Sequence, residues 1–297
     1  MLKTGIISNS YSKNYLSAIK TSNLFRLIGI YDPKFQFQYP NNINHDFVYS
    51  VFDNLLNDSD ILIFASPEKI YLPLIETAIK RSKHVFLHSV HNLSLDEQLN
   101  ILKLHEESEQ TLQIFHPLIF NNLFNKYVLS QKNPLLLEYF ITDNSEVSLL
   151  QKTRSAVSAV LPVFKSNIRK ITVNTISSLS EIPDIYKVRL NFDNSNIADF
   201  TITNIGSKRH NIKLYNYNTF YEIDLLHNLI EGTNIKQKAD SPDLLYPQND
   251  NINNQLSDFY HSVINHNIPI NNIDNEIVTQ RVVKKIKEKL RYSINLC

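Results

Sequence analysis

Residues 60–67 read DILIFASP, and this stretch decides the fold class. An aspartate precedes five consecutive apolar residues, and a Ser-Pro pair ends the run. A short apolar run bounded by turn-forming residues is typical of a strand buried on both faces of a parallel sheet. The surrounding sequence supports this reading, because β-rich runs alternate with amphipathic helices through the first half of the chain.

Working outward from residues 60–67, the same alternation predicts the other elements of a Rossmann-type sheet. Ser94 and Glu97 form a capping-box pattern that marks the start of one of its helices. Strands are expected at 3–7, 25–31, 47–49, 83–87 and 111–115, and helices at 13–21, 51–56, 70–79 and from 94 onward.

The second half has a different pattern, with one helix followed by a series of strands. Runs of strands after a single helix indicate a largely antiparallel sheet. We expect strands at 135–142, 169–175, 186–192, 197–204, 211–217 and 220–225, helices at 146–161, 255–265 and 272–290, and an irregular connection at 234–254.

The predicted fold class is therefore α/β, with an N-terminal Rossmann-type parallel sheet followed by an α+β domain with a large, mostly antiparallel sheet. The expected boundaries are 1–118 for the first, Rossmann-type domain and 119–297 for the second, α+β domain. The C-terminal helices are expected to pack back on the first domain.

Composition excludes several classes of function. Lys and Arg number 30 against 29 Asp and Glu in 297 residues, so no strong field attracts nucleic acid or an acidic membrane. The basic run at 281–291 carries apolar residues at helical spacing, which favours a solvated helix face over a nucleic-acid patch. No apolar run approaches the roughly 20 residues of a membrane span, and no secretory signal is evident, so we expect a soluble cytoplasmic protein.

Metal and disulfide chemistry is not indicated. Cys297 is the only cysteine, which excludes an internal disulfide and a multi-cysteine zinc site. The ten histidines are scattered and lack a carboxylate-supported cluster, so no metal site is predicted.

The order of elements and several local stretches resemble the Gfo/Idh/MocA family, which includes glucose-fructose oxidoreductase and inositol dehydrogenase. The stretches are residues 27–33, 51–56, 60–67, 78–85 and 258–269, and the resemblance covers nearly the whole chain. It implies a Rossmann domain that binds NAD or NADP, and a second domain that forms the sugar site and often a dimer interface.

The phosphate-binding turn of that family is replaced. A dinucleotide-binding turn uses G-x-G-x-x-G after the first strand, so that the backbone can approach the pyrophosphate. The equivalent positions are Ser8, Ser10 and Lys13, with Asn9 between the serines. Either the turn has lost its ligand, which we favour, or the hydroxyls and the lysine hold phosphate through side chains.

Four further residues could contact a cofactor. Asp32 ends the second strand, where it would accept hydrogen bonds from a ribose, or it simply starts a turn before Pro33. Ser66 and Pro67 replace the Thr-Pro of the family's turn after the central strand. Tyr71 could offer its hydroxyl to a ligand, although a half-buried helix tyrosine is the favoured reading.

The catalytic positions implied by the resemblance are also replaced. The Glu-Lys-Pro triplet becomes His88-Ser89-Val90, and Ser89 cannot supply the lysine's ammonium. His88 and His91 could act as an acid or base, but polar loop histidines are the favoured reading. The family's Asp and His on the helix of the second domain correspond to Gln151 and Ser155, with Ser158 at a further Asp position.

One hypothesis about function is a structural or oligomer-forming protein whose broad second-domain sheet is its working surface. The replacements described above lead to two further expectations. The first is a degenerate relative of NAD(P)-dependent sugar or polyol oxidoreductases, with weakened or lost hydride transfer, weak or absent binding of NAD or NADP, and a binding, regulatory or partner-subunit role. The alternative is an active oxidoreductase that uses His88, His91, His116 or Tyr71. A sugar ligand and a homo-oligomer or partner subunit are the expected partners, without nucleic acid or membrane.

Overall fold

The computed structural model describes residues 1–8, 12–33, 48–66, 68–131, 134–143, 147–164, 166–177, 183–233, 235–238 and 249–294. Over these residues no helix combines the length and apolar character that crossing a membrane would require. The chain divides into two compact units. Unit 1 comprises Met1–Pro117 and Pro247–Ile277, and unit 2 comprises Leu118–Tyr246 and Val278–Cys297.

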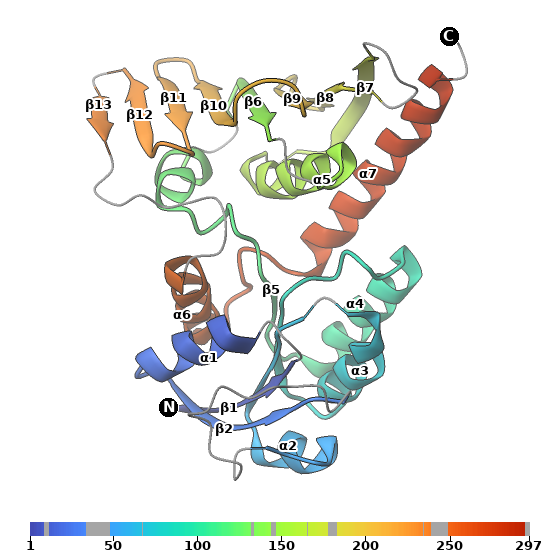
Figure 1. Ribbon diagram of the computed structural model, residues 1–297, viewed down its shortest axis with the longest axis vertical. Coiled ribbons are helices and arrows are strands. Elements are labelled where there is room, and N and C mark those ends of the chain that lie inside the picture. The colour runs from blue at the N-terminus through green and yellow to red at the C-terminus, as the bar shows by residue number, and fades with distance from the viewer. Residues whose placement is uncertain are drawn as a thin grey trace. The chain divides into compact units, whose positions relative to one another are not determined.

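Unit 1 is built on a parallel sheet of five strands in the order β2-β1-β3-β4-β5 (Figure 1). The run that opens at Asp60 forms the central strand β3, and all four of its residues are buried. This confirms the Rossmann-like first half. The strands are β1 Leu2–Ile7, β2 Phe25–Tyr31, β3 Ile61–Phe64, β4 His84–Leu87 and β5 Leu112–Ile114.

Helices cover both faces of this sheet (Figure 1), which explains why its strands are apolar throughout. On one face α1 (Ser12–Thr21) and α6 (Asn249–Asn265) pack in a cluster with Ile6, Ile63 and Phe86. The other face carries α2 (Phe52–Asp58), the 3-10 turn η2 (Lys69–Tyr71), α3 (Leu72–Lys80) and α4 (Leu95–Ser108).

Side chains and backbone from the C-terminal segment of unit 1 cover the outer edge of β5. Asn271 accepts from the backbone N–H of Ile114 at 3.1 Å and donates its side-chain amide to the carbonyl of Ile114 at 3.0 Å. Gln113 donates to Asp258 on α6 at 3.1 Å. An edge strand with unpaired backbone groups invites aggregation, so this segment protects the sheet.

Unit 2 contains a mixed sheet of eight strands in the order β13-β12-β11-β10-β6-β9-β8-β7. Only the β6–β9 pair is parallel among these neighbours, so the sheet is mostly antiparallel, as predicted. The strands are β6 Leu136–Thr142, β7 Ile168–Ile176, β8 Ile185–Phe192, β9 Ile197–Thr203, β10 Arg209–Tyr215, β11 Phe220–Asp224, β12 Leu229–Gly232 and β13 Ile235–Lys238.

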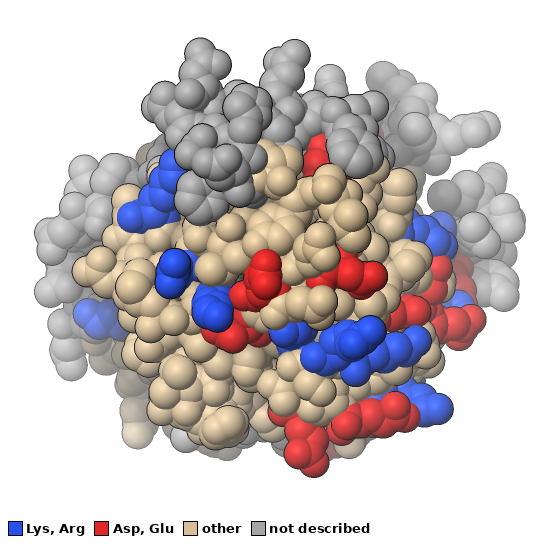
Figure 2. Space-filling model, turned by 90° about the horizontal axis from the view of Figure 1, so that it is seen from below, with Lys and Arg blue, Asp and Glu red and all other residues tan. Residues whose placement is uncertain are grey.

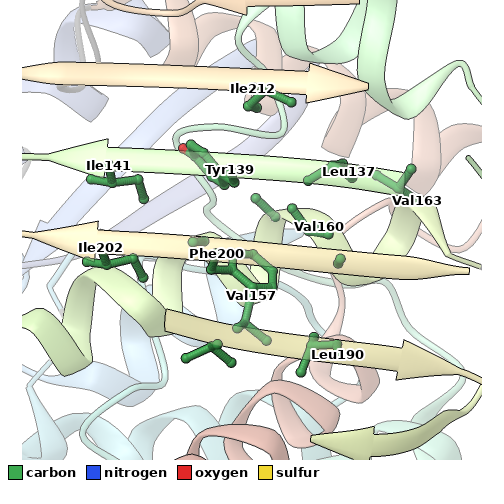
Figure 3. Packing of buried hydrophobic residues seen from close by; sticks show 14 of the residues in the cluster. Leu137, Tyr139, Ile141, Val157, Val160, Val163, Leu190, Phe200, Ile202 and Ile212 are labelled. Atoms are coloured by element: carbon green, nitrogen blue, oxygen red, sulfur yellow. The ribbon is translucent and has the colours of Figure 1, made fainter. Parts of the chain in front are cut away.

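One face of the eight-stranded sheet packs on helix α5 (Leu149–Val160) and the short turn η4 (Leu161–Val163). Figure 3 shows Tyr139 and Phe200 of two neighbouring strands close to Val157 and Val160 of the helix. A π-helix, η3 (Phe124–Leu129), also contributes to this core. The last helix, α7 (Ile273–Ile294), begins in unit 1 and continues in unit 2.

The structure corrects several sequence-based expectations. The strand expected at 47–49 is a single parallel bridge between Val48 and Ile30 over the described residues. The connection expected at 234–254 contains β13 and the start of α6. Both β12 and β13 were missed because each has only four residues, too few for an alternation of apolar residues to stand out. The expected domain boundary at 118/119 lies one residue from the observed division, while residues 247–277 belong to unit 1.

Candidate functional site

The carboxyl ends of the parallel strands form one row in unit 1. Each of four backbone N–H groups in this row donates to the last residue of a neighbouring strand, at 2.8–3.1 Å. In open α/β sheets, ligands bind in the crevice at this edge. The row across β2, β1, β3, β4 and β5 consists of Asp32, Ser8, Ala65, His88 and Phe115.

The predicted ribose and turn positions lie together on the β2–β1–β3 side of this row. Ser8, Asp32 and Ser66 are all buried, with exposed fractions of 0%, 3% and 4%. The hydroxyl of Ser66 has no hydrogen-bond partner among the described residues. Adjacent strands lie about 4.8 Å apart, so Ser8 and Asp32, which follow paired residues of β1 and β2, are neighbours at this edge.

Tyr71 belongs to the same side of the site, and the structure corrects its expected environment. The residue ends the turn η2 and is fully buried instead of half-buried. Its hydroxyl has no partner among the described residues. Burial raises the pKa of this hydroxyl, and the nearby carboxylates of Glu68 and Asp32 raise it further, so the phenol keeps its proton.

On the β4 side, His88 is engaged in contacts within the chain. Its Nδ1 is hydrogen-bonded to the hydroxyl of the buried Tyr15 on α1 at 2.8 Å. Its ring stacks on Phe115 with centroids 5.2 Å apart. Burial, with a smaller effect of His91, lowers the pKa of His88 to about 4, so the ring is neutral near pH 7. A neutral, packed imidazole is poorly suited to proton transfer.

The other predicted positions of unit 1 are distributed around this row. Ser89 is hydrogen-bonded to the exposed His91. His116 is buried just beyond β5, and Lys13 is exposed in the first turn of α1. Asn9, Ser10 and Pro67 lie outside the described residues.

The positions that the family resemblance assigned to unit 2 lie on α5. Ser148 caps the helix by accepting from the backbone N–H of Gln151 at 3.2 Å, and Gln151 itself is exposed. Ser155 is partly buried and Ser158 is buried. None of these side chains titrates near neutral pH, so none replaces a histidine as a base.

Sequence reasoning missed Lys152, the most unusual residue of α5. It is 7% exposed, and its ammonium donates to the backbone carbonyl of Asp143 and to Asn204 Oδ1, the latter at 2.7 Å. Burial lowers the pKa of this amine, and the carboxylate of Asp143 partly offsets the effect. The available signal was its spacing, because a lysine stands on the apolar stripe formed with Leu149 and Ala156.

A partly buried histidine also lies on the helix-covered face of the same sheet. His210 on β10 is hydrogen-bonded through Nδ1 to the hydroxyl of Tyr139, at 3.4 Å. Desolvation lowers its pKa to about 4. This pair consists of a buried tyrosine and a partly buried histidine, as does the pair formed by Tyr15 and His88.

The face of the unit 2 sheet opposite α5 forms a shallow concavity of about 970 Å³. Its centre is a row of charged side chains on neighbouring strands. Arg189 forms a bidentate ion pair with Asp199 at 2.6 and 2.7 Å, and Lys213 lies 3.4 Å from Glu222. The lining residues are therefore mostly polar, and a large apolar interface is not evident on this face.

Charges are mixed on the face of the molecule that Figure 2 shows, with basic and acidic side chains interspersed. Within the described part of the chain, no group of three or more His, Cys, Asp or Glu residues could hold a metal ion.

Comparisons with known proteins show the fold of the whole chain. No protein-family model matches the sequence, and neither does any curated protein. Solved structures do match. UDP-N-acetylglucosamine 3-dehydrogenase GnnA from Acidithiobacillus ferrooxidans is 12% identical, with 96% of each chain covered and a TM-score of 0.76. A dehydrogenase (MviM) from Clostridium difficile is 15% identical, with 97% of this chain and 99% of that chain covered and a TM-score of 0.78.

GenD2 from gentamicin A biosynthesis, solved in complex with NAD, is 12% identical. The match covers 98% of this chain and 94% of that chain, with a TM-score of 0.71. The resemblance to Gfo/Idh/MocA-type dehydrogenases is therefore confirmed for the fold, across nearly the full length.

Proposed function

We propose that this protein is a ligand-binding relative of the NAD(P)-dependent sugar and polyol dehydrogenases, with weakened or lost hydride transfer. The proposal rests on the two side chains that follow strand β4. Ser89 stands where a lysine would assist proton transfer, and the neighbouring His88 is held neutral between Tyr15 and Phe115. Ser89 has no group that titrates near pH 7, and a pKa of about 4 makes His88 a weak base.

Retained binding is supported by the opposite side of the row. Asp32 is buried at the end of β2, where a carboxylate can accept hydrogen bonds from ribose hydroxyls. A 2′-phosphate would meet this negative charge, so NADH should bind more tightly than NADPH. We expect the affinity for NADH to be low, because the glycines of the phosphate-binding turn are replaced.

The proposal is tested by titrating NADH and NADPH while following nicotinamide fluorescence, and by assaying NAD(P) reduction with a panel of sugars and cyclic polyols. We expect weak NADH binding that Asp32→Asn weakens about tenfold, and reduction rates equal to those without protein. Turnover abolished by His88→Gln would overturn the loss of catalysis. No binding of either cofactor at millimolar concentration would overturn the binding role.

An active oxidoreductase remains the alternative, and one observation favours it. Ser66 and Tyr71 present buried hydroxyls without partners at the ligand edge, and a bound cofactor or substrate would complete their hydrogen bonds. The turnover assay separates the two functions.

The regulatory role that we propose involves self-association or a partner subunit. The concave face of the unit 2 sheet supports it, because an uncovered sheet face lined by ion pairs such as Arg189–Asp199 can dock a surface of complementary charge. Light scattering of the purified protein measures the mass directly. A monomer at all concentrations would restrict this role to a different partner protein.

A further inference from the structure

Strand β7 lies at one end of the unit 2 sheet, and its outer edge is not paired within the described part of the chain (Figure 1). The strand pairs with β8 on one side, and no backbone hydrogen bond outside that pairing involves residues 170–175. In an antiparallel pair, alternate residues direct both backbone groups to the neighbouring strand, and the residues between them direct theirs away. About half of the N–H and C=O groups of β7 are therefore not used by the sheet.

Only the start of β7 carries features that discourage pairing with another strand. Arg169 is the extra residue of a bulge, and Arg169 and Lys170 place charge on the edge. The remaining residues, 171–176, read ITVNTI, without charge, proline or glycine and with four β-branched side chains. In unit 1, by contrast, Asn271 covers the edge of β5. The larger part of the β7 edge is therefore suited to accept a further strand.

The side chains of residues 170–174 alternate between the two faces of the sheet. Ile171 and Val173 belong to the core of unit 2, with exposed fractions of 8% and 9%. Lys170, Thr172 and Asn174 line the opposite, concave face. Any strand added at this edge must match that alternation, because directly opposed residues of paired strands lie on the same face.

Residues 170–174 read KITVN, and this segment is complementary to itself in an antiparallel pair centred on Thr172. Lys170 then lies opposite Asn174 of the second copy, and Ile171 lies opposite Val173 of the second copy. Thr172 faces its own counterpart, and threonine pairs across strands are favourable. The two lysines lie at opposite ends of the paired segment, and a net charge of +1 per chain adds little repulsion.

We propose that two copies of this chain associate through β7, in antiparallel register about Thr172, so that their eight-stranded sheets join edge to edge. This association goes beyond the proposed function, because it uses the edge of the sheet instead of its concave face and requires no cofactor.

Two matched variants test the register. Thr172→Glu and Asn174→Glu each place a carboxylate on the same face of β7 and opposite a cation of β8, which is Arg189 for the first and Lys187 for the second. Their effects within one chain should therefore be similar. Between copies they differ, because the carboxylate at position 172 faces its own counterpart, whereas the carboxylate at position 174 faces Lys170 of the second copy.

Sedimentation equilibrium of the full chain, from micromolar to submillimolar concentration, measures the Kd of the dimer, and thermal unfolding checks that each variant folds. At low salt we expect Thr172→Glu to weaken the dimer about fivefold and Asn174→Glu to strengthen it about fivefold. Asn218→Glu, at an exposed position between β10 and β11, should leave the Kd unchanged.

Two results would overturn the association through β7. The first is a monomer at every concentration for both the original chain and Asn174→Glu, which would leave a strand from a different protein as the occupant of this edge. The second is a dimer whose Kd the two variants shift in the same direction or not at all, which would leave self-association through the concave face standing. Titration with NADH is independent of both results, so a failure of cofactor binding is recognised separately.

Discussion

Gln255 and His116 lie 139 positions apart in the sequence, and the carboxamide of Gln255 forms two hydrogen bonds with the backbone of His116. Its Oε1 accepts from the His116 N–H at 2.9 Å, and its Nε2 donates to the His116 carbonyl at 3.0 Å. Both residues are buried. The glutamine thus continues the pairing of β5 beyond its last residue and joins α6 to the edge of the parallel sheet.

Replacing Gln255 should therefore destabilise unit 1. Gln255→Leu leaves a buried N–H and a buried carbonyl without partners, and each such group costs about 1–3 kcal/mol. We expect the free energy of unfolding to fall by about 2–4 kcal/mol, measured by urea denaturation. Gln151→Leu, at an exposed position of α5, should change it by no more than about 0.5 kcal/mol. Equal effects of the two variants would contradict the role of the double hydrogen bond.

Two partly buried histidines should make stability depend on pH. His88 and His210 have pKa values of about 4 in the folded protein. An unfolded histidine titrates at about 6.5, so the unfolded state binds more protons between these values. Stability is therefore fully present above about pH 6.5 and is lost as the pH falls towards 4.

The expected loss is on the order of 1–2 kcal/mol for each histidine, allowing for partial solvent exposure. Urea midpoints measured from pH 7.5 to 4.5 should give a shallower dependence in the His88→Gln and His210→Gln variants. His227→Gln, at an exposed turn position, serves as the control. An unchanged dependence in both of the first two variants would show that other groups cause it.

Lys152 should contribute to the stability of unit 2 in spite of its desolvation. Lys152→Met keeps the apolar stripe of α5 but removes the donor to the Asp143 carbonyl and to Asn204. We expect a loss of about 2 kcal/mol, since hydrogen bonds from charged donors contribute about 1.5–3 kcal/mol each and the added apolar contact offsets part of it. Lys284→Met, at an exposed position of α7, is the matched control, and urea denaturation measures both variants. A stabilised Lys152→Met variant would mean that desolvation dominates.

The capping box of α4 should be worth about 1 kcal/mol, the usual effect of an N-cap. Ser94 Oγ accepts from the Glu97 N–H at 3.3 Å, and the Glu97 carboxylate accepts from the Ser94 N–H at 2.7 Å. Ser94→Ala removes the first bond, and thermal unfolding measures the loss against Ser50→Ala at an exposed position. A difference below about 0.3 kcal/mol would show that the carboxylate caps the helix alone.

The parts of the fold that could be predicted are those in which local pattern and tertiary burial agree. Residues 61–64 are apolar because both sheet faces are covered, and Ser94 with Glu97 forms the capping box that their spacing predicts. Strands β12 and β13 escaped prediction because four residues each are too few for an alternation of apolar residues to stand out.

The candidate site was predictable only in part. Asp32, Ser66 and His88 follow strands, so the order of elements places them on one edge of the sheet. The bond between Tyr15 and His88 joins residues 73 positions apart, and no local pattern indicates it. That contact decides whether His88 faces a ligand or the core, which is why sequence reasoning left both readings open.

The division of the chain has a consequence for its synthesis. Residues 247–277 complete unit 1, since they supply α6, which covers one face of the parallel sheet, and Asn271, which covers the edge of β5. Ribosomes synthesise a chain from its N-terminus, so the first five strands leave the ribosome well before these residues do. The strands of unit 2 are therefore synthesised before α6, which completes unit 1. During this interval one face of the parallel sheet lacks α6 and the edge of β5 lacks Asn271, which leaves that edge open to pairing with other chains.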